Sequence, residues 1–392
     1  MKVLLSHGYF LKEDKAEQNI MMPYPPQGLL HIGKFLKSKG IACEIYDSTF
    51  KSFDELSLVI KKEKPKYLGL YVNLMTRPNI LKIIRHIHDS EDLRNTIIIL
   101  GGPDVRHHSE LYIQHGVDYC ISGEGEDTLL KLIGFLDKLD VDGLKNLKGL
   151  TFKNEDGKII STGESEMVAS MDNIPFPDFG LINIQEYFSI WKSHHGYNSI
   201  TMSTMRGCPY SCRWCSKAVF GRSFRRRTAS LVVKEIARLQ EQYSPDRFWI
   251  VDDVFTISKK WLVEFNNAMQ VSNLKIKYES ITRADKLDNE MIGLLKESGC
   301  FRLWIGAESG SQKVLDHMDR GVKAQVVRDM IKLTKKAGIE AGTFLMLGYP
   351  GEDEKDIIET VNHLKDAAPD HFTVTLSYPI PGTEFYNEVK DI

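Results

Sequence analysis

Short apolar runs alternate with amphipathic helical patterns in two long blocks of this 392-residue chain. In the first block, helical patterns such as those over residues 29–39 and 80–88 separate five strand-like runs. Strands that alternate with helices form parallel sheets with right-handed crossovers. The pattern therefore predicts a Rossmann-like or flavodoxin-like α/β domain. The five strand-like runs cover residues 3–5, 42–46, 67–72, 97–100 and 119–121.

The alternation stops between residues 141 and 195. The segment LTFKNEDGKIIST has a Glu-Asp-Gly turn between two apolar runs, which predicts a β-hairpin. The segment NIPFPDF then has two closely spaced prolines, which are typical of a connector. The chain is also long for a single core. We therefore predict a first domain over residues 1–140, a connector over 141–195 and a second domain over 196–392.

The second block contains six strand-like runs with helical patterns between them. Six β/α units are too few to close an eight-stranded barrel, so the pattern predicts a partial, open (β/α)6 barrel. Catalytic residues of such barrels lie on the loops that follow the strands. The six runs cover residues 199–204, 248–251, 277–281, 303–306, 343–347 and 372–376.

Composition limits the partners that this chain can be expected to have. The formal net charge is −2, which gives no global reason to expect nucleic acid or an anionic membrane. No run of 18 apolar residues is present, so we expect no membrane-spanning helix. Three of the six cysteines, Cys43, Cys120 and Cys300, are isolated in apolar stretches, which argues against a disulfide framework. We therefore expect a reducing, cytoplasmic location.

The other three cysteines are clustered in the segment CPYSCRWC, directly after the first predicted strand of the second block. Cys208, Cys212 and Cys215 have the spacing C-x3-C-x2-C. A structural zinc site needs four ligands, and no fourth cysteine or histidine lies close behind the cluster. A cubane iron-sulfur cluster held by three thiolates would keep one iron open for another ligand. The residues alone leave both a zinc-stabilised binding protein and an iron-sulfur enzyme open.

The same segment resembles the signature of the radical S-adenosylmethionine (SAM) superfamily, with Trp214 in its aromatic position. The resemblance implies a 4Fe-4S cluster, with SAM bound at the open iron and cleaved to a 5′-deoxyadenosyl radical. Many members have Gly-Gly-Glu after the second strand, whereas FWIVDDVFT has two acids, as is typical of the cobalamin branch. The residues that the resemblance assigns to SAM are Trp214, Asp252, Asp253, Arg283, Glu308, Ser309 and Thr343.

Three segments of the first block resemble the cobalamin-binding domain of that branch: YPPQGLLHIGKFLKSKG, IIILGGPDVRHHSE and VDYCISGEGEDTLL. Here Gln27 replaces the family's usual leucine. The Asp-x-His-x-x-Gly motif of another cobalamin class is missing, so we expect no histidine below the cobalt. The residues implied for cobalamin are Pro26, Gln27, Gly28, Asn73, Met75, Thr76, Gly101, Gly102, Pro103, Gly123, Glu124 and Gly125.

The resemblance implies an enzyme that methylates an unactivated carbon of a small-molecule substrate, with an external reductant such as flavodoxin or ferredoxin. A non-methylating radical reaction, such as the oxidative cyclisation of the magnesium-protoporphyrin ester cyclase branch, is the first alternative. Methylthiotransfer to tRNA and a zinc-stabilised binding protein are more distant alternatives. The sequence identifies no residue that acts directly on the substrate. Relatives commonly continue past the last predicted helix, so we expect a minimal or a truncated member.

Overall fold

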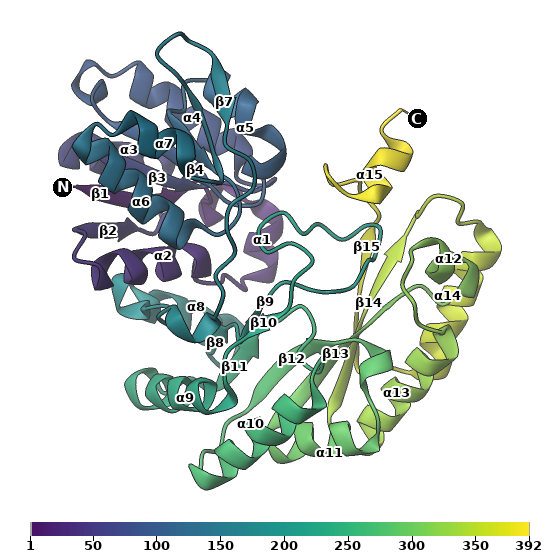
Figure 1. Cartoon of the computed structure of the whole chain (residues 1–392). Coiled ribbons are helices and arrows are strands. Elements are labelled where there is room, and N and C mark those ends of the chain that lie inside the picture. Colours follow the sequence, from purple (N-terminus) through teal and green to yellow (C-terminus); the bar gives the residue numbers. More distant parts are fainter. Residues whose placement is uncertain (1, 392) are drawn as a thin grey trace. The chain divides into compact units, whose positions relative to one another are not determined.

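The computed structural model describes residues 2–391, and the chain divides into two compact units (Figure 1). The first unit contains the chain up to Gly196 together with Ala218–Gly221. The second contains Tyr197–Lys217 and the chain from Arg222 onward. The predicted connector, residues 141–195, falls within the first unit. Among the described residues, no helix combines the length and apolarity needed to cross a membrane.

The first unit is built on one sheet with the strand order β2-β1-β3-β4-β5-β6-β7. The first five strands in the chain are parallel, as predicted, and their order is that of flavodoxin-like domains. The predicted hairpin adds β6 and β7 as an antiparallel extension. The strands are β1 (Val3–His7), β2 (Cys43–Tyr46), β3 (Tyr67–Tyr71), β4 (Ile97–Gly101), β5 (Tyr119–Ile121), β6 (Leu150–Lys153) and β7 (Ile159–Ser161).

Helices cover both faces of this sheet, because consecutive strand residues alternate between two apolar cores. Leu4 packs into a core with helices α3, α4 and α5, whereas Val3 and Leu5 pack into another with α2 and α6. The helices are α1 (Lys15–Ile20), α2 (Gln27–Ser38), α3 (Phe53–Glu63), α4 (Arg77–His88), α5 (Val105–Gln114), α6 (Gly125–Lys138), α7 (Val141–Asn146) and α8 (Ile184–His195). Short 3-10 turns are η1 (Leu11–Glu13), η2 (Glu91–Leu93), η3 (Met171–Asn173) and η4 (Phe179–Leu181).

The second unit has a six-stranded parallel sheet with the order β15-β14-β13-β12-β11-β8. This is the predicted partial barrel: each strand lies beside the next one of the six, and the sheet does not close. The strands are β8 (Ser199–Met202), β11 (Arg247–Ile250), β12 (Tyr278–Thr282), β13 (Cys300–Glu308), β14 (Glu340–Leu347) and β15 (His371–Leu376). A separate small ladder joins β9 (Met205–Arg206) to β10 (Arg225–Arg226).

Helices line one face of this curved sheet (Figure 1). Apolar strand residues such as Ile200, Phe248 and Leu303 are buried. One aromatic group, Phe255, Trp261, Phe265 and Tyr278, joins α10 to the neighbouring strand β12. The helices are α9 (Ala229–Tyr243), α10 (Lys259–Val271), α11 (Asn289–Glu297), α12 (Gln312–His317), α13 (Ala324–Lys336), α14 (Glu354–Ala367) and α15 (Glu384–Val389), with the 3-10 turn η5 (Ala284–Lys286). The fold class predicted for both units is confirmed.

Candidate functional site

The three clustered cysteines lie on the loop that follows β8 and β9, at the carboxyl edge of the parallel sheet. Cys208 and Cys212 are partly buried, and Cys215 is exposed. The loop begins at Gly207, whose φ of 82° is left-handed. A Cβ at Gly207 would lie 2.5 Å from the carbonyl oxygen of Ser223, so only glycine fits this turn. The sequence therefore places all three thiols where barrel enzymes keep their catalytic groups.

Residues 318–320, between α12 and α13, hold the middle of this loop. The carbonyl of Met318 accepts a hydrogen bond from the backbone N–H of Arg213 at 3.1 Å. The Ser211 hydroxyl donates to a carboxylate oxygen of Asp319 at 2.6 Å. Trp214 is anchored separately, in an apolar cluster whose buried members are Val314, Met318, Tyr349 and Phe385. Trp214 is thus placed as a packing residue of the loop, and its predicted role toward SAM stays a prediction.

The environment of the Cys208 and Cys215 thiols favours their neutral form. Desolvation by the surrounding loop raises the pKa of Cys215 to about 11, and the Asp253 carboxylate adds to that rise. Burial also raises the pKa of Cys208, although a backbone hydrogen bond opposes the rise. Binding of iron would therefore displace protons, because thiolates are the ligating form. Soft sulfur donors suit an iron-sulfur cluster.

No group of three or more His, Cys, Asp or Glu side chains in residues 2–391 is arranged to hold a single metal ion. A cubane distributes its cysteines over different iron atoms, so its ligands do not have to converge on one point. Three thiols on one loop, with no fourth ligand required from the protein, fit such a cluster.

Asp252, the first of the two acids after β11, is buried at 1% exposure and bonded on all sides. Its carboxylate accepts hydrogen bonds from the backbone N–H groups of Thr204 at 2.7 Å and Met205 at 3.2 Å. The hydroxyls of Ser203 and Thr204 and the guanidinium of Arg226 also donate to it. These contacts fix the turn that leads into the cysteine loop. Asp252 is therefore placed to position the loop, and its predicted contact with SAM has no free carboxylate oxygen to support it.

Asp253, the second acid, is exposed, and it is close enough to Cys208 and Cys215 for its charge to raise their pKa values. Desolvation raises its pKa, the neighbouring Asp252 raises it further, and Lys217 lowers it. The Lys217 ammonium is buried and has no hydrogen-bond partner among the described residues. Asp253 is thus the better placed of the two acids to meet a positively charged group of a ligand, such as an amine.

Arg283 directly follows β12, and Glu308 is the last residue of β13. The structure brings these two residues together near Cys212. The Arg283 guanidinium is 3% exposed and stacks on the ring of Tyr210, 3.9 Å from the ring centre. Glu308 has a left-handed φ of 63°, a conformation that costs a non-glycine residue energy and is concentrated at functional sites. Burial raises the pKa of Glu308, whereas Arg320 and Arg283 lower it. The carboxyl group of this residue is a candidate to receive a ligand hydroxyl.

Ser309 and Thr343 are fully buried and serve the barrel wall. The Ser309 hydroxyl contacts the hydroxyl of Thr360 at 3.1 Å and accepts from the backbone N–H of Ser311. The Thr343 hydroxyl donates to the carbonyl of Ile305 at 2.7 Å. Their predicted contacts with SAM stay predictions.

The glycines predicted to admit cobalamin in the first unit differ in what surrounds them. A Cβ on Gly101, which ends β4, would meet no atom within 4 Å. The next residue, Gly102, has φ of 116°, and a Cβ there would lie 2.4 Å from the carbonyl oxygen of Val72. A Cβ on Gly28, at the start of α2, would touch the ring of Tyr71. Gly101 is therefore the residue of the three where a large ligand can approach the backbone.

Gly123 and Gly125 follow β5 and make room for parts of their own unit. A Cβ on Gly123 would overlap the hydroxyl oxygen of Ser165 at 1.9 Å, and one on Gly125 would lie 3.2 Å from Ile32. Glu124 between them is buried, and its carboxylate accepts a hydrogen bond from the backbone N–H of Val168 at 3.0 Å. These residues hold the connector in the structure, so a role toward cobalamin stays a prediction for them and for Pro26, Gln27 and Pro103.

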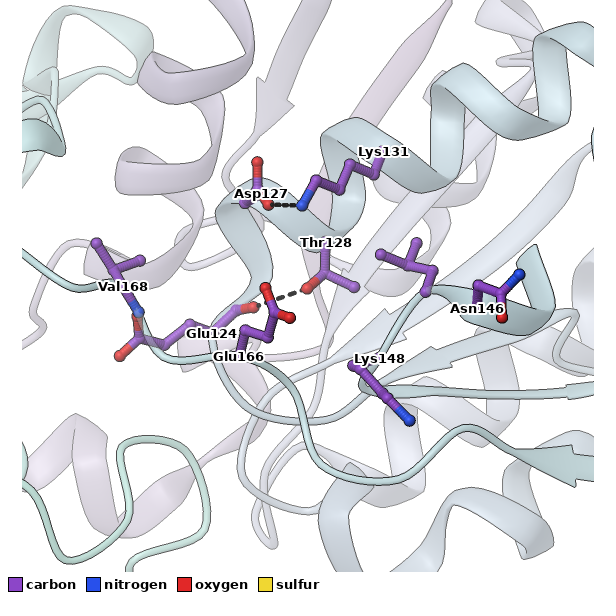
Figure 2. Close-up of a pocket in the computed structure, with 9 residues that line it drawn as sticks. Glu124, Asp127, Thr128, Lys131, Asn146, Lys148, Glu166 and Val168 are labelled. Atoms are coloured by element: carbon purple, nitrogen blue, oxygen red, sulfur yellow. Dashed lines mark hydrogen bonds and ion pairs between the residues drawn. The ribbon is translucent and has the colours of Figure 1, made fainter. Parts of the chain in front are cut away.

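A small cavity of about 90 Å³ lies beside Glu124. Figure 2 shows the side chains that line it. Because ligand pockets usually enclose about 300–1,000 Å³, this cavity cannot hold a cobalamin. Its most polar pair, Asp127 and Lys131, is already joined by an ion pair of 2.6 Å. The cavity is lined by Glu124, Asp127, Thr128, Lys131, Asn146, Leu147, Lys148, Glu166 and Val168.

The loop after β3 has the predicted residues Asn73, Met75 and Thr76. Asn73 and Thr76 close a turn on each other, because the Thr76 N–H donates to the Asn73 side-chain oxygen at 2.9 Å and the Asn73 N–H donates to the Thr76 hydroxyl at 3.0 Å. Met75 is 62% exposed, and its neighbour Leu74 is 54% exposed. Exposed apolar side chains beside an open glycine backbone fit a large, partly apolar ligand such as cobalamin.

Sequence reasoning missed three residues of the second unit: Lys217, Arg226 and Arg320. Lys217 follows the third cysteine and Arg226 lies on β10, but basic residues are ordinarily solvated and gave no signal. Arg320 lies in the segment HMDRG, more than 100 positions from the cysteines, and only folding brings it to Cys212.

The family model described as the radical SAM superfamily matches residues 202–364, and the model described as a B12 binding domain matches residues 18–133. An uncharacterised methyltransferase of Pyrococcus horikoshii is 26% identical over 370 residues, which are 92% of this chain and 78% of the relative. An anaerobic magnesium-protoporphyrin IX monomethyl ester cyclase of Synechocystis is 26% identical over 92% of this chain and 72% of the relative. Cytidylyl-2-hydroxyethylphosphonate methyltransferase of Streptomyces wedmorensis is 26% identical over 86% of this chain and 69% of the relative.

Two solved structures share the fold of the whole chain. The cobalamin-dependent SAM radical enzyme OxsB superposes with a TM-score of 0.78 at 20% identity. This chain is covered fully in that comparison and spans 55% of the OxsB chain. The radical SAM methyltransferase TsrM from Kitasatospora setae superposes with a TM-score of 0.79 at 18% identity, over 99% of this chain and 75% of TsrM. At these identities the likeness concerns the fold.

Proposed function

We propose that this chain, which belongs to the radical SAM superfamily and has a B12 binding domain ahead of its barrel, is a cobalamin-dependent methyltransferase. The observation that carries the proposal is the loop of Cys208, Cys212 and Cys215 at the carboxyl edge of a six-stranded half-barrel. The proposed substrate is a small molecule with an unactivated carbon. When bound, the 4Fe-4S cluster, SAM and cobalamin supply the radical and methyl-transfer chemistry.

The chain's own residues hold and shield these groups. Three thiols ligate the cluster, and Asp252 with Arg226 keeps the preceding turn in place. Asp253 offers a carboxylate to the SAM amino group, and Glu308 offers one to a ribose hydroxyl. In the first unit, the open backbone at Gly101 receives the planar part of cobalamin.

The proposal is tested by anaerobic reconstitution of the full chain with iron, sulfide and cobalamin, followed by reaction with SAM labelled in its methyl group. We expect 5′-deoxyadenosine and S-adenosylhomocysteine to form, and label to enter the substrate. Candidate substrates are tested as a panel of small metabolites. A protein that binds one zinc and no sulfide after anaerobic purification would contradict the proposal.

The magnesium-protoporphyrin IX monomethyl ester cyclase relatives support a second candidate, an oxidative ring closure without methyl transfer. The labelled methyl group separates the two reactions. In a cyclase, 5′-deoxyadenosine forms and no label reaches the product. In a methyltransferase, label and product appear in equal amounts.

The proposal includes an external one-electron reductant such as flavodoxin or ferredoxin, because SAM cleavage consumes an electron. It also places the enzyme in the cytoplasm, where the buried thiols of Cys43, Cys120 and Cys300 stay reduced. Turnover with purified flavodoxin and its reductase, compared with turnover without them, tests the reductant.

A further inference from the structure

Two buried guanidinium groups point at the sulfur of Cys212. Nη1 of Arg283 lies 3.7 Å from the sulfur, and Nη1 of Arg320 lies 3.8 Å from it. Both distances fit N–H···S hydrogen bonds. No comparable donors are directed at Cys208 or Cys215 among the side-chain hydrogen bonds of the described residues. The arrangement therefore singles out one of the three proposed cluster ligands.

The two arginines differ in their other contacts. Nε of Arg283 donates to Asp285 at 2.8 Å, and Nη2 donates to the carbonyl of Arg320 at 2.7 Å. Nη2 of Arg320 donates to the carbonyl of Gly306 at 3.1 Å. Its Nε is buried and has no hydrogen-bond partner in residues 2–391, although the side chain is only 7% exposed. Arg283 has a carboxylate hydrogen-bonded to it, whereas the charge of Arg320 is less compensated.

The charge of Arg320 is partly balanced by Glu308, whose Oε1 lies 3.7 Å from Nη2. Gly306 permits this approach, because a Cβ there would lie 2.7 Å from the Arg320 guanidinium. Residues 318–320 also bind the loop on both sides of Cys212, as described above. Arg320 is thus fixed against the sulfur by backbone contacts and by packing, and not by a chance surface rotamer.

We propose that Arg320, with Arg283, sets the reduction potential of the iron-sulfur cluster by donating hydrogen bonds to the Cys212 sulfur. Reduction adds one electron to the cluster, and a fixed positive charge at the sulfur stabilises that added charge. Arginine keeps its proton at every accessible pH, and the buried position strengthens the interaction. The inference rests on the proposed function, because Cys212 carries a cluster only in that case. Arg320 is a positioning and tuning residue that makes no contact with substrate.

The test is a potentiometric titration of the reconstituted full chain without SAM at pH 8.5, followed by the electron paramagnetic resonance signal of the reduced cluster. In Arg320→Gln, we expect the ratio of reduced to oxidised cluster at a fixed potential to fall about tenfold, which is about 59 mV for a one-electron couple. Arg320→Lys keeps the charge and should shift less. Glu308→Gln removes the nearest negative charge and should shift the midpoint in the opposite direction.

Arg302→Gln is the matched control, because this arginine lies near the start of β13, the strand that ends at Glu308, and pairs with Glu340. Its midpoint should equal that of the wild type. An unchanged midpoint in Arg320→Gln overturns the inference. Midpoint shifts of equal size in Arg320→Gln and Arg302→Gln also overturn it. If Arg320→Gln assembles no cluster, Glu308→Gln decides alone, and a midpoint that does not rise overturns the inference. A wild-type chain without iron and sulfide instead overturns the proposed function.

Discussion

The carboxyl edges of the two parallel sheets differ in how far their polar side chains are paired within the protein. In the first unit these residues bond mainly to one another: His7 lies 3.0 Å from both Asp47 and Ser48, and Asp104 is held by Arg77 and Tyr112. In the second unit, Cys212, Arg320 and Lys217 present groups that the described protein residues satisfy only in part. The named polar groups of the first edge are paired within the protein, whereas those of the second keep unpaired donors.

The largest expected effect comes from removing a thiol at the carboxyl edge of the second unit's sheet. Cys208→Ala, Cys212→Ala and Cys215→Ala should each reduce 5′-deoxyadenosine formation below detection, because three ligands are the minimum for the cluster. Iron and sulfide content and chromatographic detection of 5′-deoxyadenosine measure the result. Ser216→Ala, on the same loop, is the control and should keep activity. Retained SAM cleavage in any of the cysteine variants means that the ligand assignment is wrong.

The two neighbouring acids after β11 should separate structure from ligand binding. Asp252→Asn leaves the buried Arg226 uncompensated and should lower the free energy of unfolding by about 3–5 kcal/mol. Asp253→Asn changes an exposed residue and should alter it by less than about 0.5 kcal/mol, while weakening SAM binding. Urea unfolding of the metal-free chain and equilibrium dialysis with SAM measure the two effects. Equal destabilisation by both variants would remove the distinction drawn between them.

At the carboxyl edge of the first unit's sheet, the pairing of Asp104 should make the free energy of unfolding depend on pH in acid. Burial alone would raise the pKa of Asp104, but hydrogen bonds from Arg77 and Tyr112 outweigh it and lower the pKa. The stabilisation from this group is therefore fully present above the unfolded pKa of about 3.9 and is lost as pH falls through the lower folded value.

Asp104→Asn should accordingly cost about 2 kcal/mol at pH 7 and progressively less as the pH falls below 4. Urea midpoints across pH 2–7 measure the effect. Asp54→Asn, at the exposed start of α3, is the control and should change little at any pH. A constant cost for Asp104→Asn across this range would contradict the pKa argument.

The smallest expected effect lies at Gly101 of the first unit, and its neighbour Gly102 provides the comparison. Gly102→Ala should cost about 1–3 kcal/mol, because its left-handed φ and the close Val72 carbonyl exclude a side chain. Gly101→Ala meets open space and should change stability by less than about 0.5 kcal/mol. If cobalamin lies against Gly101, the added methyl group should weaken its binding about tenfold in an absorbance titration. Unchanged affinity would move the ligand away from this residue.

Much of the architecture was readable from local patterns. The two alternating blocks predicted both parallel sheets, and the Glu-Asp-Gly turn predicted the hairpin. These predictions succeeded because strand and helix periodicity depends on residues close in sequence. The extent of the first unit was harder to read, because the connector packs onto this unit through contacts such as the one between Glu124 and Val168.

The candidate site was predictable only where a motif marks it. The cysteine spacing and the paired acids are local signals, so the sequence marks Cys208, Cys212, Cys215 and Asp253 as candidates, and their roles stay predictions. The pattern could not tell which of two adjacent acids is buried against an arginine. It also could not tell which glycines make room for a neighbouring side chain and which face open space. These outcomes depend on partners distant in sequence.

The sequence by itself determined the two α/β blocks, the loop of three thiols and the likeness to radical SAM enzymes with a cobalamin domain. All of these features depend on the spacing and order of residues along the chain. Only the tertiary structure decided that Arg320 reaches the Cys212 sulfur, that Asp252 closes a turn and that Gly101 is open. The physical reason is that burial, hydrogen bonding and charge compensation are properties of neighbours in space, and folding sets those neighbours.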